Sequence, residues 1–212
     1  MILKDAFRLM SKAIRSTLKR DADNRRSPEP IWPEPPRSTW EQYLSIEELF
    51  EESGVQIRFL QGKLEIAPPV SEYHENRKSH IARLVETWCV EKDVNFFGKG
   101  NYTMLNPEES GGEPDECYCL RENKEWPDLV IEVALTSGGL SKRKFYATFP
   151  IPELWIWRNE KLEVHTFNLD TQEYETAEES VQLPGIDLDC LVECSQLEST
   201  RDAIVTFRDR IS

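Results

Sequence analysis

The sequence predicts an α/β (α+β) protein, in which a mixed or mostly antiparallel β-sheet is flanked by helices and preceded by an N-terminal helical extension. Two observations predict this class. Segments with apolar residues at helical spacing are interleaved with short apolar runs typical of strands. Several of those runs are joined by short turns, which favours hairpins and antiparallel pairing. Helices interleaved with hairpins bury their apolar faces in a layered, mixed architecture.

The chain begins with a basic helix and a proline-rich linker. Apolar residues recur at helical spacing over Ile2–Lys19, with lysines and arginines on the other side. Such a helix either touches nucleic acid or a membrane surface, or docks on its own domain or a partner subunit. Ser27–Arg37 contains five prolines and cannot form a regular element. We therefore expect residues 1–38 to form an extension and residues 39–212 to form the main domain.

The main domain is expected to open with short elements around one long helix. Ser45 is a plausible N-cap with Glu48 three residues on, which predicts a capping-box helix that ends before Gly54. The remaining elements expected here are a hairpin over 56–60 and 63–67, a helix over 71–93, strands over 94–97 and 102–105 around a Gly-Lys-Gly turn, and a polar loop over 107–112.

The second half predicts most of the sheet. Asp115–Leu120 and Trp126–Val133 are apolar strands joined by a charged turn, and each begins near a Pro-Asp pair. After them we expect a lysine-rich helix start near 142, a strand over 154–157, a hairpin over 162–168 and 174–178, a strand or loop over 181–186, and helices over 188–194 and 200–211.

Composition and charge limit the functions that fit. No apolar run approaches the roughly 18 to 20 residues of a membrane span, and no signal peptide precedes the domain, so we expect a cytoplasmic protein without a membrane span. The net charge of −13 argues against tight, metal-free DNA binding. Residues 1–38 hold nine basic and five acidic residues, whereas the remainder holds 17 and 34. Clustered carboxylates that bind divalent cations would explain why the main domain is acidic.

The five cysteines favour buried, reduced thiols. Cys117 and Cys119 lie two apart on an expected strand, and Cys190 and Cys194 lie four apart. Neither pair has the C-x2-C spacing of a zinc site, and no histidine cluster accompanies them. Metal ligation and disulfides are the less favoured alternatives.

Three carboxylates lie in or beside the central apolar strands. Asp128 and Glu132 are four apart on one strand, which separates them by about 13 Å, too far to share a metal ion. Counting back through the turn places Asp115 beside Glu132, about 5 Å away on the neighbouring strand. We expect these two to share a divalent cation and Asp128 to fix the turn. A salt bridge from Glu132 to Arg143 or Lys144 is the alternative.

Several stretches resemble the Uma-type restriction endonuclease family of the PD-(D/E)XK nuclease superfamily, from about Glu48 to the C-terminus. The stretches that carry the resemblance are QGKLEIAPPVSEYHE, EPDECYCL, WPDLVIEV, TSGGLSKRKFY and IPELWIW. The resemblance implies a restriction-endonuclease-like fold and a Mg²⁺- or Mn²⁺-dependent endonuclease that hydrolyses DNA. It further implies that Asp115, Glu132 and the backbone carbonyl of Val133 bind the metal ion.

The lysine of the superfamily motif is displaced in this chain. The motif D/E-x-K would place it at position 134, where the chain has Ala134. The Uma-type pattern K-x-x-x-Y instead matches Lys142 and Tyr146, which makes Lys142 the expected catalytic lysine and Lys144 the runner-up. A solvated lysine in a basic run is the alternative for both. The resemblance also suggests auxiliary metal ligands, namely Glu65, His74 and Glu75.

Three functions stay open on the sequence alone. The first is a DNA endonuclease, for which a homodimer would suit a double-strand cut. The second is a catalytically degenerate nuclease-fold module that binds a protein or nucleic-acid partner, which Ala134 and the acidic balance favour. The third is a hydrolase acting on another substrate.

Overall fold

The computed structural model describes residues 37–50, 55–67, 70–100, 102–134 and 140–212, which form two compact units. The first unit comprises the described residues up to 74 together with 103–113 and 140–148. The second comprises 75–102, 114–134 and 149–212. The expected helix over Ile2–Lys19 lies outside the described residues, so the boundary at residue 38 stays a prediction.

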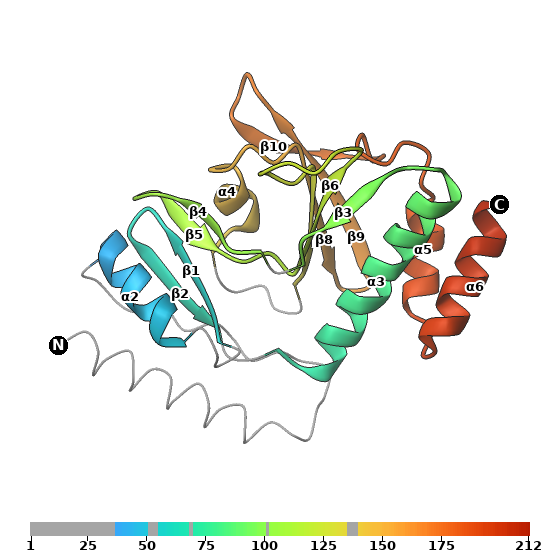
Figure 1. Cartoon of the computed structure of the whole chain (residues 1–212), viewed down its shortest axis with the longest axis horizontal. Helices are drawn as coiled ribbons and strands as arrows, with labels where there is room; N and C mark the ends of the chain where they lie inside the picture. The colour runs from blue at the N-terminus through green and yellow to red at the C-terminus, as the bar shows by residue number, and fades with distance from the viewer. Residues whose placement is uncertain (1–36, 51–54, 68–69, 101, 135–139) are drawn as a thin grey trace. The chain divides into compact units, whose positions relative to one another are not determined.

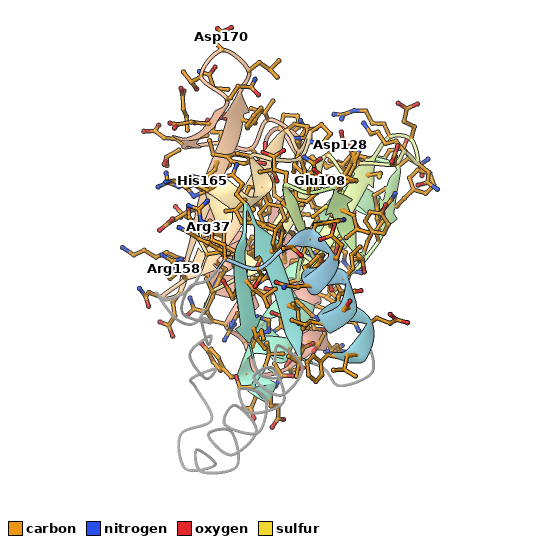
Figure 2. The ribbon with its side chains drawn as sticks, turned by 90° about the vertical axis from the view of Figure 1, so that its left-hand side faces the viewer. Arg37, Glu108, Asp128, Arg158, His165 and Asp170 are labelled. Carbon is orange, nitrogen blue, oxygen red and sulfur yellow. The ribbon has the colours of Figure 1, made fainter. Side chains whose placement is uncertain are left out.

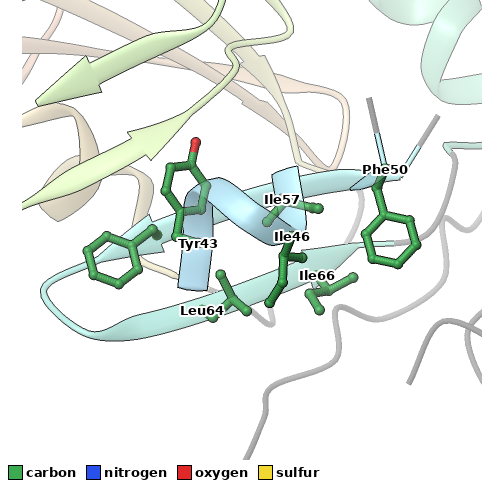
Figure 3. Close-up of a cluster of buried hydrophobic side chains, with 7 residues drawn as sticks. Tyr43, Ile46, Phe50, Ile57, Leu64 and Ile66 are labelled. Atoms are coloured by element: carbon green, nitrogen blue, oxygen red, sulfur yellow. The ribbon is translucent and has the colours of Figure 1, made fainter. Parts of the chain in front are cut away.

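The first unit is a small antiparallel sheet with its own core. Its strands follow the order β2-β1-β5-β4, and α2 packs on β1 and β2 (Figure 1). The core consists of Tyr43, Ile46, Phe50, Ile57, Phe59, Leu64 and Ile66 (Figure 3). The elements are α2 (Trp40–Phe50), β1 (Gln56–Leu60), β2 (Lys63–Ala67), β4 (Met104–Asn106), β5 (Ser110–Gly112) and α4 (Lys142–Tyr146).

Helix α2 begins five residues earlier than the sequence predicts, so the expected capping box is wrong. The Thr39 amide donates to Gln42 Oε1 at 2.9 Å, and the Gln42 amide donates to Thr39 Oγ1 at 3.3 Å. This reciprocal pair is a capping box that lies six residues ahead of the one expected. Ser45 lies inside the helix, where its hydroxyl donates to the Glu41 carbonyl at 2.8 Å. Gly54 lies outside the described residues.

The expected polar loop over 107–112 is also wrong, because Ser110–Gly112 forms β5 between β1 and β4. A Ser-Gly-Gly run has low strand propensity, so this strand is not predictable from its own residues. Tertiary packing explains the strand. A Cβ atom at Gly111 would overlap the Tyr43 ring, so glycine lets that ring lie directly on the sheet backbone.

The second unit contains a six-stranded mixed sheet in the order β10-β9-β8-β7-β6-β3. Its β7–β8 pair is parallel and the other neighbours are antiparallel. Helices α3, α5 and α6 lie side by side (Figure 1), and the β9–β10 hairpin ends at Asp170 (Figure 2). The elements are α3 (Glu72–Glu91), β3 (Phe96–Gly98), β6 (Glu116–Leu120), β7 (Leu129–Val133), β8 (Glu153–Arg158), β9 (Lys161–Asn168), β10 (Glu173–Ala177), α5 (Leu188–Ser195) and α6 (Thr200–Ile211).

Most elements of this unit match the prediction. The long helix, the central strands, the β9–β10 hairpin and both C-terminal helices are confirmed. The strands expected on either side of Gly98–Gly100 exist but do not pair, because β3 joins β6 and β4 joins β5 in the other sheet. The expected single sheet is therefore two sheets, although the mixed class flanked by helices is correct. None of the described helices is long and apolar enough to cross a membrane.

Three helices of this unit are held together by polar contacts as well as apolar ones. His80 on α3 contacts the Ser195 carbonyl through Nδ1 at 3.1 Å and the Thr200 hydroxyl through Nε2 at 2.9 Å. The Arg77 guanidinium donates to the same carbonyl and lies 5.3 Å from the centre of the Trp157 ring. These contacts fix α3 against the end of α5 and the start of α6.

The five cysteines are buried free thiols, as the sequence favours. Cys190 Sγ and Cys194 Sγ lie 4.0 Å apart, a thiol–thiol contact. Burial raises the pKa of Cys117 to about 12 and that of Cys89 to about 11, because a desolvated thiolate is unfavourable. Raised pKa values leave few thiolates near neutral pH, and thiolates are the reactive form.

We expect an aromatic disulfide reagent at pH 8 to label less than about one thiol per folded chain, because all five thiols are buried and out of reach of the reagent. In denaturant it should label all five cysteines. Release of the coloured thiolate, followed by absorbance, measures both states. Rapid labelling of two or more thiols in the folded chain would contradict this account.

Candidate active site

Two carboxylates lie opposite each other where β6 begins and β7 ends. Glu116 is paired with Ile131 in the antiparallel register. One residue further out, Asp115 therefore faces Glu132, as the strand geometry of the sequence predicts. Both side chains are buried, with 4% of Asp115 and 1% of Glu132 exposed. Two buried carboxylates on neighbouring strands form an arrangement that a divalent cation stabilises.

The end of β7 holds the Asp115 side chain in place. The Val133 amide donates to Asp115 Oδ2 at 2.8 Å. The preceding Pro114 has no N–H and a restricted φ, which sets the direction of the chain into β6. Asp115 is thus fixed to the residue that follows Glu132, and the carboxylate needs little rearrangement to bind a ligand.

The second Pro-Asp pair has a structural role, which confirms the expectation for Asp128. Asp128 Oδ2 accepts from the Leu120 amide at 2.7 Å, and Oδ1 accepts from Lys124 Nζ at 2.7 Å. These bonds close the turn between β6 and β7. The two Pro-Asp pairs look equivalent in the sequence, but Asp128 lies at the other end of the strand pair from Asp115.

Helix α3 carries a lysine, Lys78, whose charge acts on this group of carboxylates. Lys78 Nζ lies 2.9 Å from Glu75 Oε2. Burial lowers the pKa of Lys78, but a hydrogen bond to Glu75 and the charges of Glu75, Asp115 and Glu116 raise it overall. Burial raises the pKa of Glu116, and the charge of Lys78 opposes that rise. The charge of Lys78 thus acts on the pKa of Glu116, and the charges of Asp115 and Glu116 act on that of Lys78.

A sequence signal for Lys78 exists in the helical spacing. Lys78 is followed at i+4, i+7 and i+11 by Ala82, Val85 and Cys89, all of which are buried. These four residues lie on one stripe of α3. A lysine that continues an apolar stripe lies against the protein rather than in solvent, and this spacing is visible in the sequence.

The three auxiliary residues have contacts of their own. Glu65 in β2 is buried opposite Arg58 in β1, with 3.8 Å between Oε1 and Nη1, and it accepts from the Leu140 amide. The His74 amide donates to Ser71 Oγ at 3.3 Å, which makes Ser71 the cap of α3. Glu75 pairs with Lys78. Metal binding by Glu65, His74 or Glu75 stays a prediction.

The predicted catalytic lysine lies in the first unit, on the short helix α4. Ser141 caps this helix by accepting from the Lys144 amide at 3.4 Å. Lys142 is half-buried, Lys144 is exposed, and Tyr146 is buried with its ring centre 5.0 Å from that of Phe145. The catalytic role of Lys142 stays a prediction, as does the alternative of Lys144.

The donor set suits a magnesium-type ion rather than a zinc-type ion. Among the described residues, no group of three or more His, Cys, Asp and Glu side chains could hold a metal ion. Mg²⁺ is usually bound by only one or two carboxylates, with water and substrate phosphates completing its shell. Asp115 and Glu132 therefore fit Mg²⁺ or Mn²⁺, whereas Zn²⁺ would need further nitrogen or sulfur ligands.

Comparison with known proteins places the chain in a family. The sequence pattern of Uma2, described as "Putative restriction endonuclease", matches residues 40–196. The chain belongs to this family. The match includes Asp115, Glu132 and Lys142, and it confirms the resemblance seen in the sequence.

A solved structure is also similar in fold. It is described as a "putative nuclease belonging to DUF820 from Anabaena variabilis ATCC 29413". It is 12% identical, with a TM-score of 0.47, and the alignment covers 80% of this chain and 98% of that chain. A search of curated proteins finds no match.

Proposed function

We propose that this Uma2-family protein is a Mg²⁺- or Mn²⁺-dependent endonuclease that hydrolyses phosphodiester bonds of DNA. Membership of a restriction endonuclease family supports nuclease activity. The observation that carries the metal dependence is the facing pair of Asp115 and Glu132, buried at the ends of two neighbouring strands. Burying two like charges side by side is costly unless a cation or hydrogen-bond donors compensate them.

In this mechanism, Asp115, Glu132 and the Val133 carbonyl would hold the divalent ion. When bound, such an ion polarises the phosphate and lowers the pKa of a coordinated water. The hydrogen bond from the Val133 amide keeps the Asp115 carboxylate oriented before substrate arrives. Lys142 orients the attacking water and stabilises the negative charge that develops on the phosphoryl oxygens.

The charge of the chain indicates how DNA binds. At a net charge of −13, the body of the protein repels a polyanion in the absence of metal. A divalent ion bound by Asp115 and Glu132 would neutralise their two negative charges, so we expect DNA binding to depend on the metal. The basic residues 1–38 add sequence-independent attraction, and a homodimer would present two sites for a double-strand cut.

The test is a cleavage assay with Mg²⁺ and with Mn²⁺ on supercoiled, linear duplex, single-stranded and branched DNA. The wild-type chain should cut at least one form, and Glu132→Gln should lower its rate at least about 1,000-fold, because the charge that holds the ion is lost. Gln keeps the size of Glu, so circular dichroism of the variant should match that of the wild type. Equal cutting by both proteins would refute the assignment.

Calorimetric titration with Mn²⁺ separates the nuclease from a module that binds a partner without cutting. The alanine at position 134 favours such a module, since the motif lysine is missing there. A nuclease should bind Mn²⁺ with an affinity that Glu132→Gln reduces. A degenerate module should show no binding, or binding that the substitution leaves unchanged.

A further inference from the structure

The small sheet of the first unit contains a buried ion pair. Arg58 in β1 lies directly opposite Glu65 in β2, with 3.8 Å between Nη1 and Oε1, and 4% of each side chain is exposed. Because side chains alternate along a strand, the pair lies on the face of the sheet away from Phe59 and Leu64 of the core. Both charged groups also bind backbone outside their own hairpin, and these two contacts concern the candidate active site.

The first contact holds the chain that leads into Asp115. Arg58 Nη2 donates to the Glu113 carbonyl at 3.0 Å, and the Glu113 side chain accepts from Thr103 Oγ1 at 2.9 Å. Pro114 separates Glu113 from Asp115, and its ring fixes φ, which leaves few free torsions between the two residues. The direction in which the chain enters β6 therefore depends on where Arg58 holds the Glu113 carbonyl.

The second contact holds the start of the helix that carries Lys142. Glu65 Oε2 accepts from the Leu140 amide. The next residue, Ser141, is the N-cap of α4, and Lys142 is the first residue of this helix. Both carboxylate oxygens of Glu65 thus have a partner, Arg58 for Oε1 and the Leu140 amide for Oε2.

The rest of α4 is fastened to the same sheet. A Cβ atom at Gly112 in β5 would lie 2.8 Å from Arg58 Cγ and 3.2 Å from Phe145 Cζ, so glycine lets the arginine stem and the helix pack on the strand. After the helix, the Thr148 carbonyl accepts from Asn106 Nδ2 of β4 at 2.8 Å. One end of α4 is therefore held by β4, and the other by Glu65.

We propose that Arg58 and Glu65 are a positioning pair for DNA cleavage. Arg58 sets the path of the chain into Asp115, and Glu65 sets the start of the helix that carries Lys142. This inference rests on the proposed function, and neither side chain contacts the substrate. It assigns Glu65 to positioning in place of the auxiliary metal ligation that the family resemblance suggests, since both of its oxygens already accept contacts.

Stability and positioning can be separated, because a buried ion pair contributes little net stability when apolar residues of similar volume replace both partners. The test uses the full chain with Arg58→Met/Glu65→Met, Arg58→Lys and the control Lys63→Met. The double variant removes both backbone contacts without leaving an unpaired buried charge. Arg58→Lys keeps Glu65 and the positive charge, but a single ammonium group replaces a fork whose two nitrogens reach two partners. Lys63 is an exposed cation on the same hairpin.

We expect the double variant to melt close to the wild type but to cut about 100 times more slowly in single turnover with saturating Mg²⁺. A misplacement of about 1 Å in a catalytic group is enough for such a loss. Hydrogen exchange followed by mass spectrometry should be faster in the peptides that cover 113–120 and 140–148. Arg58→Lys should cut about ten times more slowly, which the loss of a metal ligand at position 65 could not explain. Lys63→Met should match the wild type in all three measurements.

If the wild type cuts DNA and the double variant cuts equally fast, the pair has no positioning role, although the proposed function stands. If the double variant melts more than about 10 °C lower, Arg58→Lys decides in the same way. If the wild type cuts no form of DNA, the proposed function fails and hydrogen exchange decides the inference. Faster exchange confined to the two segments, in a variant that melts like the wild type, would then support the positioning pair, and unchanged exchange would refute it.

Discussion

Replacing Asp115 by asparagine is expected to abolish metal-dependent DNA cleavage while the fold is retained. The amide oxygen of asparagine can still accept the hydrogen bond that the Val133 amide donates at 2.8 Å. The strand ends therefore stay in register. The negative charge that holds the divalent ion is lost, so we expect the single-turnover rate to fall at least about 1,000-fold. Cleavage of a labelled duplex in saturating Mg²⁺ measures the rate.

The second Pro-Asp pair provides a matched control. Asp128→Asn removes the same charge from a residue with the same local sequence, but Asp128 serves the turn through Leu120 and Lys124. We expect this variant to cut DNA at close to the wild-type rate and to lose about 1 to 2 kcal/mol of stability, because one charge-assisted hydrogen bond is weakened. Asp115 is not a metal ligand if Asp115→Asn cuts DNA at the wild-type rate. The same conclusion follows if Asp115→Asn and Asp128→Asn lose the same amount of activity.

The difference between Asp115 and Asp128 could be predicted from the sequence. Strand spacing and turn length were enough to separate Asp115 from Asp128, because the side-chain period of a strand and the register of a short connection are local properties. Lys78 was harder to find, since its approach to Asp115 depends on how α3 packs against the sheet. In the sequence, only its position on the apolar stripe of α3 indicates that Lys78 lies against the protein.

The fold was predictable where the pattern was local and strong. Helix α6 and the β9–β10 hairpin have clear periodicity and turn residues, and the structure agrees with both. Strand β5 was not predictable, because a Ser-Gly-Gly run becomes a strand only when β1 and β4 pair with it and the Tyr43 ring packs on Gly111. The start of α2 differs from the prediction because the sequence contains two possible capping boxes. The box at Thr39 and Gln42 forms, and the one at Ser45 and Glu48 does not.

A carboxylate outside the site, Glu153, is expected to be the most sensitive position for stability. It begins β8, its side chain is fully buried, and it lies opposite Leu129 of β7. Oε1 accepts from Trp155 Nε1 and Ser180 Oγ, both at 2.6 Å. Oε2 accepts from the amides of Val181 and Gln182 at 2.8 and 3.0 Å. One side chain thus ties the loop before α5 to the central strands.

Glu153→Gln should therefore lower the free energy of unfolding by about 3 to 5 kcal/mol, because an NH2 group would face two donors in place of an acceptor oxygen. For a domain of this size, the melting temperature should fall by roughly 6 to 20 °C. Urea unfolding followed by circular dichroism measures the change, with Glu173→Gln on the exposed face of β10 as the control. The control should stay within about 0.5 kcal/mol of the wild type. A loss below about 1 kcal/mol for Glu153→Gln would mean that the four hydrogen bonds are not what holds this loop to β8.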